Sequence, residues 1–190
     1  FNAGVFSIRE KTPNFNDVSI RVEGQGYTDA WVFSQMRSSL ARDALIIGDI
    51  HGCIEELRQL ILKAGFIIDD NDEIIPSDIS PSYIVLVGDL IDKGPDSGAV
   101  IDFVYNNIQS GVLFVVKGNH DVNTLDILEG RKEVEPEKRN KWYDASLTFQ
   151  HDEDRQKKLK EILRSSKVYF YAPNFVVTHC PCPVKYIGKN

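Results

Sequence analysis

The side chains best suited to chemistry in this chain stand directly after short apolar segments. Asp49 and His51 follow the apolar run at 44–47, one residue apart, with Gly48 before and Gly52 after the pair. Carboxylate oxygens and imidazole nitrogens are common ligands of divalent transition metals, and alternate positions of an extended segment point to the same side. The two glycines allow a sharp turn and a close approach of the backbone. This stretch therefore predicts a metal site.

The same arrangement occurs three more times along the chain. Apolar runs at 83–87, 112–116 and 175–178 lead into the remaining candidate side chains, which are Asp89, Asp92, Lys93, Asn119, His120 and His179. Unbroken apolar runs of this length are typical of strands that a parallel sheet buries on both faces. Ligands of open α/β sheets bind beyond the carboxyl ends of the strands, so we expect these side chains to meet there.

The segments between the strands predict the elements that position them. Apolar residues at helical spacing predict one amphipathic helix over 54–64, ended by Gly65, and a second over 99–105, capped by Asp96. Residues 69–81 are acidic and rich in turn formers, which predicts a surface loop. The order of strand, loop and helix is that of an α/β domain.

The outer segments carry weaker signals. Residues 1–43 alternate moderately in polarity and contain Gly24 and Gly26, which predicts a lead-in segment of short strands with a turn at these glycines and a helix that begins near Trp31. Residues 44–190 form the domain itself. Residues 129–167 are dense in mixed charge, and we expect two exposed helices there that form a cap over the rim of the site. A solvated face is the simpler interpretation of such charge, and a substrate or partner surface is the alternative.

Composition limits the classes of function. A chain of 190 residues with 42% hydrophobic and 26% charged residues fits one soluble globular domain. A net charge of −6 argues against a broad nucleic-acid-binding face, and no apolar run is long enough to span a membrane or to act as a secretory signal. The three cysteines fit a reducing compartment, so we expect a cytoplasmic location. The chain begins at Phe1 without an initiator methionine, and we expect a fragment or processed product.

Together, the candidate ligands predict a two-metal site that acts on phosphate. Two divalent ions about 3.5–4 Å apart need a shared anionic bridge, and Asp89 is our choice for it. Asp49 and His51 would hold the first ion, and Asn119 and His179 the second. Two such ions activate a water for attack on phosphorus and neutralise charge on the phosphoryl oxygens.

Proton transfer and phosphate contact would fall to the neighbouring residues. His120 would protonate the departing oxygen as general acid, and Asp92 would hold the imidazolium in its protonated form. Lys93 would contact a phosphate oxygen as a point charge, and Asn119 would share in substrate binding. The simpler interpretations are a turn-capping Asp92 and a solvated Lys93. His151 lies in a polar segment and is interpreted as a surface histidine.

Three segments resemble the ordered signatures of the calcineurin-type metallophosphoesterases. They are Gly-Asp-Ile-His-Gly at 48–52, Gly-Asp-Leu-Ile-Asp-Lys-Gly-Pro-Asp-Ser at 88–97 and Gly-Asn-His-Asp at 118–121. The second and third are most similar to the ApaH-like branch of the phosphoprotein-phosphatase superfamily, which includes bacterial and phage serine/threonine phosphatases. The resemblance implies a metallophosphoesterase-type α/β sandwich, flanked by helices, with two divalent ions such as manganese, iron or zinc at the strand ends.

The resemblance has departures that affect substrate and metal binding. This branch usually carries arginine where Lys93 stands, and lysine does not replace its bidentate grip on phosphate. The family motif usually continues as His-Ala-Gly or His-Gly-Gly, whereas here His179 is followed by Cys-Pro-Cys. The resemblance also implies a further histidine ligand downstream of the His179 position, which lies beyond Asn190.

The sequence therefore predicts a metal-dependent phosphohydrolase that cleaves phosphomonoesters or phosphoanhydrides. Dinucleoside polyphosphates, RNA ends and phosphoproteins are the candidate substrates. The alternative is a catalytically incomplete fragment that acts as a binding or assembly module. A nuclease-type phosphodiesterase fits less well, because the Lys-Gly-Pro-Asp-Ser stretch at 93–97 is similar to the phosphatase branch.

Overall fold

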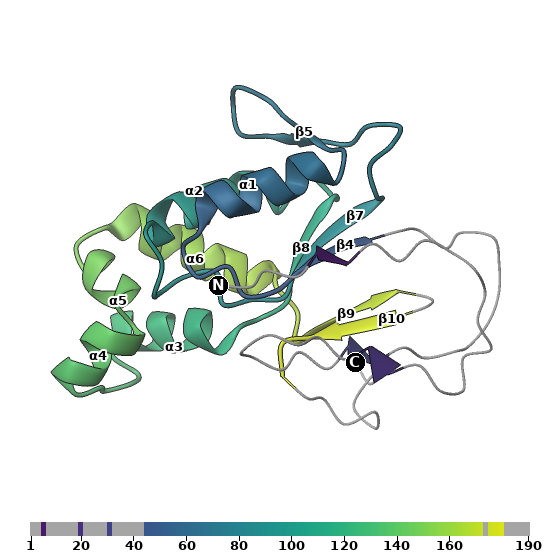
Figure 1. Ribbon diagram of the computed structural model, residues 1–190. Coiled ribbons are helices and arrows are strands. Elements are labelled where there is room, and N and C mark those ends of the chain that lie inside the picture. The colour runs from purple at the N-terminus through teal and green to yellow at the C-terminus, as the bar shows by residue number, and fades with distance from the viewer. Residues whose placement is uncertain (1–4, 7–18, 21–29, 32–43, 173–174, 181–190) are drawn as a thin grey trace.

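The computed structural model describes residues 5–6, 19–20, 30–31, 44–172 and 175–180 (Figure 1). Its helices are α1 Ile54–Lys63, α2 Ser97–Asn107, α3 Asn119–Leu128, α4 Pro136–Trp142, α5 Ala145–Thr148 and α6 Glu153–Ser165. Its strands are β1 Val5–Phe6, β2 Ser19–Ile20, β3 Ala30–Trp31, β4 Ala44–Ile47, β5 Ile67–Ile68, β6 Ile74–Ile75, β7 Tyr83–Leu86, β8 Leu113–Val115, β9 Tyr169–Ala172 and β10 Phe175–Thr178.

A parallel sheet carries the first three predicted strands. Its order is β1-β4-β7-β8, in which β4, β7 and β8 are parallel and β1 runs antiparallel to β4. Val85 lies opposite both Ile46 and Phe114, so the three parallel strands end at a common edge. The connections β4-α1-β7 and β7-α2-β8 cross over on helices, as parallel neighbours require. The prediction of a parallel sheet flanked by helices is confirmed.

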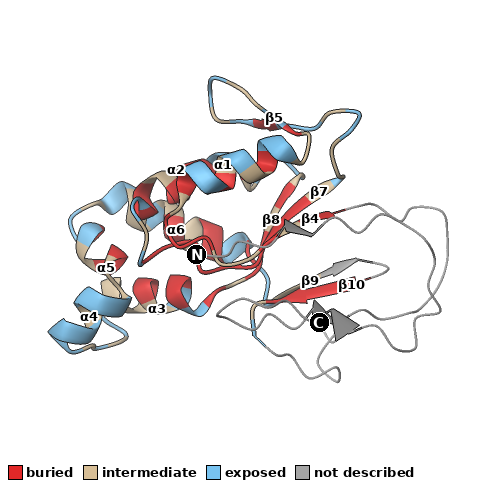
Figure 2. Cartoon of the chain, viewed as in Figure 1, coloured by how far each residue is buried: buried red, intermediate tan, exposed pale blue. Residues whose placement is uncertain are grey.

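Alternate residues of these strands enter two separate cores. Ile84 and Leu86 of β7 join a core shared with α1, α2 and α6, and both are fully buried. Val85 and Val87 face the other way, into a smaller core with Phe175 and residues of the second sheet. Burial of side chains of this size stabilises the fold by about 1.5–3 kcal/mol each. Figures 1 and 2 show the helices on one side of the parallel sheet and β9 and β10 on the other.

The second sheet supplies the fourth predicted strand. Its order is β2-β3-β10-β9, and all of its neighbouring strands are antiparallel. Phe175, Val176 and Val177 of β10 are buried, so the strand is held against its surroundings along its length. The strand ends at Thr178, and His179 follows it directly, as the sequence predicted.

The charged segment at 129–167 differs from its prediction. It forms three helices in place of two, and the longest of them, α6, belongs to the main core. Leu159, Ile162 and Leu163 are buried there because they recur at helical spacing on one face of an otherwise charged helix. Only α4, with no buried residue, has the exposed character that was expected, as Figure 2 shows.

Two other segments also depart from expectation. The predicted loop at 69–81 contains β6, which pairs with β5 as a short hairpin of two residues in each strand. Trp31 lies in the strand β3, and the residues after it, where the helix was expected to continue, lie outside the described residues. The turn expected at Gly24–Gly26 lies outside the described residues. Within the part of the chain that the structure describes, no helix combines the length and the apolar character needed to cross a membrane.

Candidate metal and catalytic centre

The loops that follow β4, β7, β8 and β10 bring the predicted ligands together. Two sets of side chains each offer one ligand atom within 4.8 Å of one another. One set is Asp49, Asp89 and His179, and the other is His51, Asp89 and His120. Asp89 belongs to both sets, which is the position expected of a bridging carboxylate. Four segments spread over 130 residues of sequence thus meet at one place.

The backbone of these loops is strained in a way that aims the side chains. His51 and Asp89 both have φ of 47°, and Asp92 and Lys93 both have φ of 69°. Each such residue costs about 1–3 kcal/mol and persists only when its surroundings hold it. The Asp89 carbonyl accepts hydrogen bonds from the backbone N–H groups of Ile50 and His51, at 3.1 and 2.8 Å. The two loops therefore hold each other in this conformation.

Glycine is required where the loops after β7 and β8 touch. A Cβ added to Gly88 would lie 2.3 Å from the backbone nitrogen of Gly118, and Gly88 has φ of +89°. A Cβ added to Gly118 would lie 2.0 Å from the backbone nitrogen of Asp89 and 2.4 Å from its Oδ1. The two glycines let the backbones approach, so that His120 N–H donates a hydrogen bond to Asp89 Oδ1 at 2.9 Å.

Both candidate histidine ligands are oriented by backbone carbonyls. His51 Nδ1 lies 2.9 Å from the oxygen of Ile91, and His179 Nδ1 lies 2.7 Å from the oxygen of Val87. With its Nδ1–H donated to a carbonyl, each ring keeps Nε2 as an acceptor, which is the tautomer that metal-binding histidines commonly adopt. His51 Nε2 faces Asp89 Oδ2 at 3.8 Å, and His179 Nε2 faces Asp89 Oδ1 at 3.4 Å.

The centre is a cluster of acceptors that suits cations. Asp49 Oδ2 lies 3.9 Å from His51 Nε2, and Asn119 Oδ1 lies 2.9 Å from His179 Nε2. Acceptors that face one another at these distances are unfavourable without positive charge between them. The Lys93 ammonium supplies some of that charge, because its Nζ lies 2.9 Å from His51 Nε2. The mixture of carboxylate, carboxamide and imidazole ligands fits divalent transition ions.

His120 and Asp92 form a buried pair beside these ligands. His120 Nδ1 lies 2.8 Å from Asp92 Oδ2, which also accepts from Thr124 Oγ1 at 3.2 Å, while Asp92 Oδ1 accepts from Ala145 N–H at 2.9 Å. Burial lowers the pKa of His120, but the hydrogen bond to Asp92 and the charge of Asp89 outweigh it and leave the pKa raised. The imidazolium form is therefore favoured.

Several residues of this centre were not predicted from the sequence as parts of it. The Tyr143 ring lies 5.5 Å from the His120 ring, and Asp144 Oδ1 accepts from Lys93 N–H at 2.9 Å. Both lie in a segment with no local signal. Thr124 stands four residues after His120 on α3, so helical spacing pointed to it.

Asp121, in the first turn of α3, is fully buried inside the centre. It accepts hydrogen bonds from the N–H groups of Leu90, at 2.8 Å, and Gly118, at 3.3 Å. Burial and the charge of Asp89 raise the pKa of Asp121 to about 7. Through these two hydrogen bonds, the carboxyl group of Asp121 links the loop after β7 to the start of α3.

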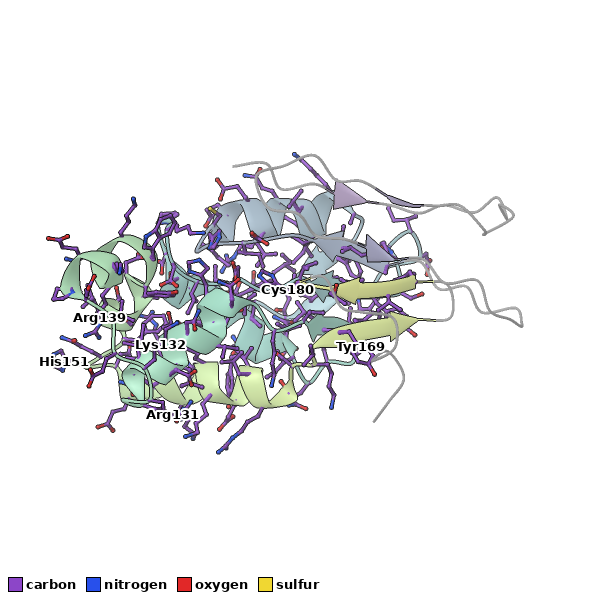
Figure 3. The ribbon with its side chains drawn as sticks, turned by 90° about the horizontal axis from the view of Figure 1, so that it is seen from below. Arg131, Lys132, Arg139, His151, Tyr169 and Cys180 are labelled. Carbon is purple, nitrogen blue, oxygen red and sulfur yellow. The ribbon has the colours of Figure 1, made fainter. Side chains whose placement is uncertain are left out.

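The remaining predicted features lie outside the centre. His151 is exposed, with its ring beside Gln150, and points away from the body of the molecule, which confirms that it is a surface histidine (Figure 3). Asp96 caps α2 through a hydrogen bond of 2.8 Å from Ala99 N–H, as expected. Cys53 and Cys180 are free thiols.

The fold and the centre together define a metallophosphoesterase domain. Residues 44–183 match the profile of the calcineurin-like phosphoesterases, and the chain belongs to this family. The region matched contains all four loops of the centre.

Comparison with curated proteins shows which members of this family the chain is similar to. The chain is 32% identical, over 150 residues, to the asymmetrical bis(5'-nucleosyl)-tetraphosphatase PrpE of Oceanobacillus iheyensis; the match covers 76% of this chain and 58% of the relative. It is 35% identical, over 102 residues, to a symmetrical bis(5'-nucleosyl)-tetraphosphatase of Buchnera aphidicola, with 54% and 31% covered. The matches thus cover about a third to three fifths of these relatives. The crystal structure of a cold-active protein-tyrosine phosphatase of a Shewanella species is similar at a TM-score of 0.45 and 20% identity, with 68% of this chain and 39% of that chain covered.

Proposed function

We propose that the chain is a metal-dependent phosphohydrolase that cleaves phosphoanhydrides or phosphomonoesters. The observation that carries this proposal is the position of Asp89, whose two carboxylate oxygens face the Nε2 atoms of two histidines oriented by backbone carbonyls. Histidines that bind metals commonly donate their other ring N–H to a carbonyl or carboxylate, whereas a structural ion pair does not need this orientation.

The ligands divide into two sets around Asp89. Asp49 and His51 would hold one divalent ion, and Asn119 and His179 the other, with Asp89 shared. Asp49 also offers a ligand atom within 4.8 Å of those of Asp89 and His179, so it lies beside both positions. Ions bound there would supply an acidified water as nucleophile and positive charge for the phosphoryl oxygens. Manganese, iron and zinc all accept this mixture of oxygen and nitrogen ligands.

The protein's own residues would manage the proton and orient the phosphate. As the imidazolium, His120 donates Nδ1–H to Asp92, and its Nε2–H is free to pass a proton to the departing oxygen. Asp92 is 0% exposed and accepts from three donors, so it stays in place while His120 changes charge. Lys93 is exposed, with its ammonium group beside His51, and we assign it and Asn119 to the phosphate oxygens.

Dinucleoside polyphosphates are the substrates we place first. The two curated relatives described above are named as bis(5'-nucleosyl)-tetraphosphatases, and the matches cover 76% and 54% of this chain. Phosphorylated RNA ends and phosphoproteins are the further candidates. In the same proposal, the two sheets form the sandwich of the family within a domain at 44–190, and α4 with α5 forms the cap at its rim.

Hydrolysis of diadenosine tetraphosphate, followed by chromatography with added Mn²⁺, tests the proposal. We expect turnover that needs the metal and falls at least about a hundredfold in the Asp89→Asn variant. The matched control is Asp70→Asn, the same substitution at an exposed aspartate, and it should keep wild-type turnover. A folded chain that binds Mn²⁺ and turns over neither this substrate nor p-nitrophenyl phosphate would contradict the proposal and favour a binding module.

A further inference from the structure

We infer that Trp142 is a stacking platform for the base of a nucleotide whose phosphate lies at the metal centre. Trp142 ends α4 and is 44% exposed, which is unusual for so large a ring. The inference rests on the proposed function, which places a phosphate at the centre. It adds a site for the base and assigns that site to one residue.

Two lysines lie beside the indole ring, and one of them connects the ring to the centre. Lys93 Nζ lies 5.8 Å from the centroid of the Trp142 ring, and the same nitrogen lies 2.9 Å from His51 Nε2. The ammonium group of Lys93 therefore lies between a candidate metal ligand and the exposed ring. That interval is within the reach of a single nucleoside monophosphate. Lys141 Nζ lies 4.9 Å from the centroid of the same ring.

The segment that carries Trp142 is fixed to the catalytic loop. Asp144 Oδ1 accepts from the backbone N–H of Lys93, and the backbone N–H of Ala145 donates to Asp92 Oδ1, both at 2.9 Å. The neighbouring Tyr143 ring packs 5.5 Å from the His120 ring. These contacts hold the start of α5 against the residues that would act on the phosphate, so the position of the indole relative to that phosphate is defined.

The chemistry of this rim fits a ligand that is both anionic and aromatic. Lys93 and Lys141 flank the indole, and Lys132 and Arg139 lie at the same α3–α4 end of the molecule (Figure 3), which also carries Glu133, Glu135 and Glu137. Ammonium groups attract phosphates, and an exposed indole stacks on the flat face of any base. A phosphoprotein would use the lysines but has no base for the ring.

Binding of AMP, compared with ribose 5-phosphate, isolates the contribution of the base. Tryptophan fluorescence of the Trp31→Phe variant reports Trp142 alone, because the chain has two tryptophans. We expect AMP to quench this emission and to bind about tenfold more tightly than ribose 5-phosphate. In the Trp142→Ala variant, calorimetry should show equal affinities for the two ligands, whereas Trp142→Phe should keep most of the difference.

Two lysine substitutions in α4 test the contribution of positive charge to ligand binding. Lys141→Met should weaken binding of both ligands severalfold, and Lys138→Met, which removes another lysine of α4 that pairs with Glu135, should not. These measurements need no turnover, so they remain informative if the proposed hydrolysis fails. Equal affinities of wild-type protein for AMP and ribose 5-phosphate, or an unchanged AMP affinity in Trp142→Ala, would overturn the inference.

Discussion

The substitution Asp92→Asn tests the role of the buried pair with little change of shape. Asp92 accepts from His120, Thr124 and Ala145, and the asparagine oxygen can still accept from the Ala145 N–H. The new amide nitrogen then faces His120 Nδ1 as a donor, so this ring nitrogen must give up its proton. Thr124 can reverse its hydroxyl and accept from the amide. The fold is therefore retained while the imidazolium form loses its partner.

The expected magnitude follows from the lost charge-assisted hydrogen bond. Such bonds contribute about 1.5–3 kcal/mol, which corresponds to about a 10- to 150-fold loss in rate when the bond supports a transition state. The loss should depend on the leaving group, because a general acid matters only where the departing oxygen is basic. We expect kcat to fall by about a hundredfold for phenyl phosphate and by much less for 2,4-dinitrophenyl phosphate.

The pH dependence of kcat tests the same interaction between His120 and Asp92. The pKa of His120 is raised in the wild type, so the acid form persists to higher pH and activity falls as pH rises through that pKa. In Asp92→Asn the charge and the acceptor are removed, the pKa falls, and the alkaline limb of kcat should move to lower pH. Asp126→Asn, on the outer side of α3 and paired with Arg131, is the control and should leave the limb in place.

The proposed role of His120 would be refuted if Asp92→Asn lowered kcat equally for both leaving groups and also lost bound metal. His120 also lies within one of the two potential ligand sets, with His51 and Asp89. If His120 were a metal ligand, its displacement would lower the metal content measured by elemental analysis and slow every substrate alike. That outcome would remove His120 and Asp92 from the role of proton donor and its partner.

Three further predictions concern packing and metal binding. Gly118→Ala should abolish tight Mn²⁺ binding measured by calorimetry, because its Cβ would lie 2.4 Å from Asp89 Oδ1, whereas Gly48→Ala, with open space around it, should keep wild-type thermal stability. Leu159→Ala should cost about 2–5 kcal/mol in urea unfolding, and the exposed Lys157→Ala less than about 0.5 kcal/mol; equal effects would contradict the placement of α6 in the core. Chelator treatment should lower the melting temperature and Mn²⁺ should restore it, by up to about 2.7 kcal/mol of stability at a hundredfold excess over Kd; no change would contradict a metal site.

The central part of the fold was predictable because its signals are local. The apolar runs before Asp49, Asp89 and His120 are buried on both faces by helices and by the second sheet, so every position in them is hydrophobic. The turns after them show glycine beside acid and histidine, and these residues meet for the reason that parallel strands end at one edge. His179 also reaches the centre, although it follows a strand of the other sheet.

The features that escaped prediction depend on tertiary contacts. The α6 stripe of Leu159, Ile162 and Leu163 is present in the sequence, but the surrounding charges dominate its average polarity. The contact of Ala145 with Asp92 spans 53 residues and involves a backbone N–H, so no residue type marks it. The β5–β6 hairpin has only two residues in each strand, too few for an alternating pattern to show.

Anomalous diffraction from a crystal grown with Mn²⁺ tests the central claim most directly. Two peaks should flank the Asp89 carboxylate, one beside Asp49 and His51 and the other beside Asn119 and His179. A crystal with Mn²⁺ bound only at sites that do not include Asp89, or with no ion near the four loops, would contradict the claim that this carboxylate is shared by two metal ions.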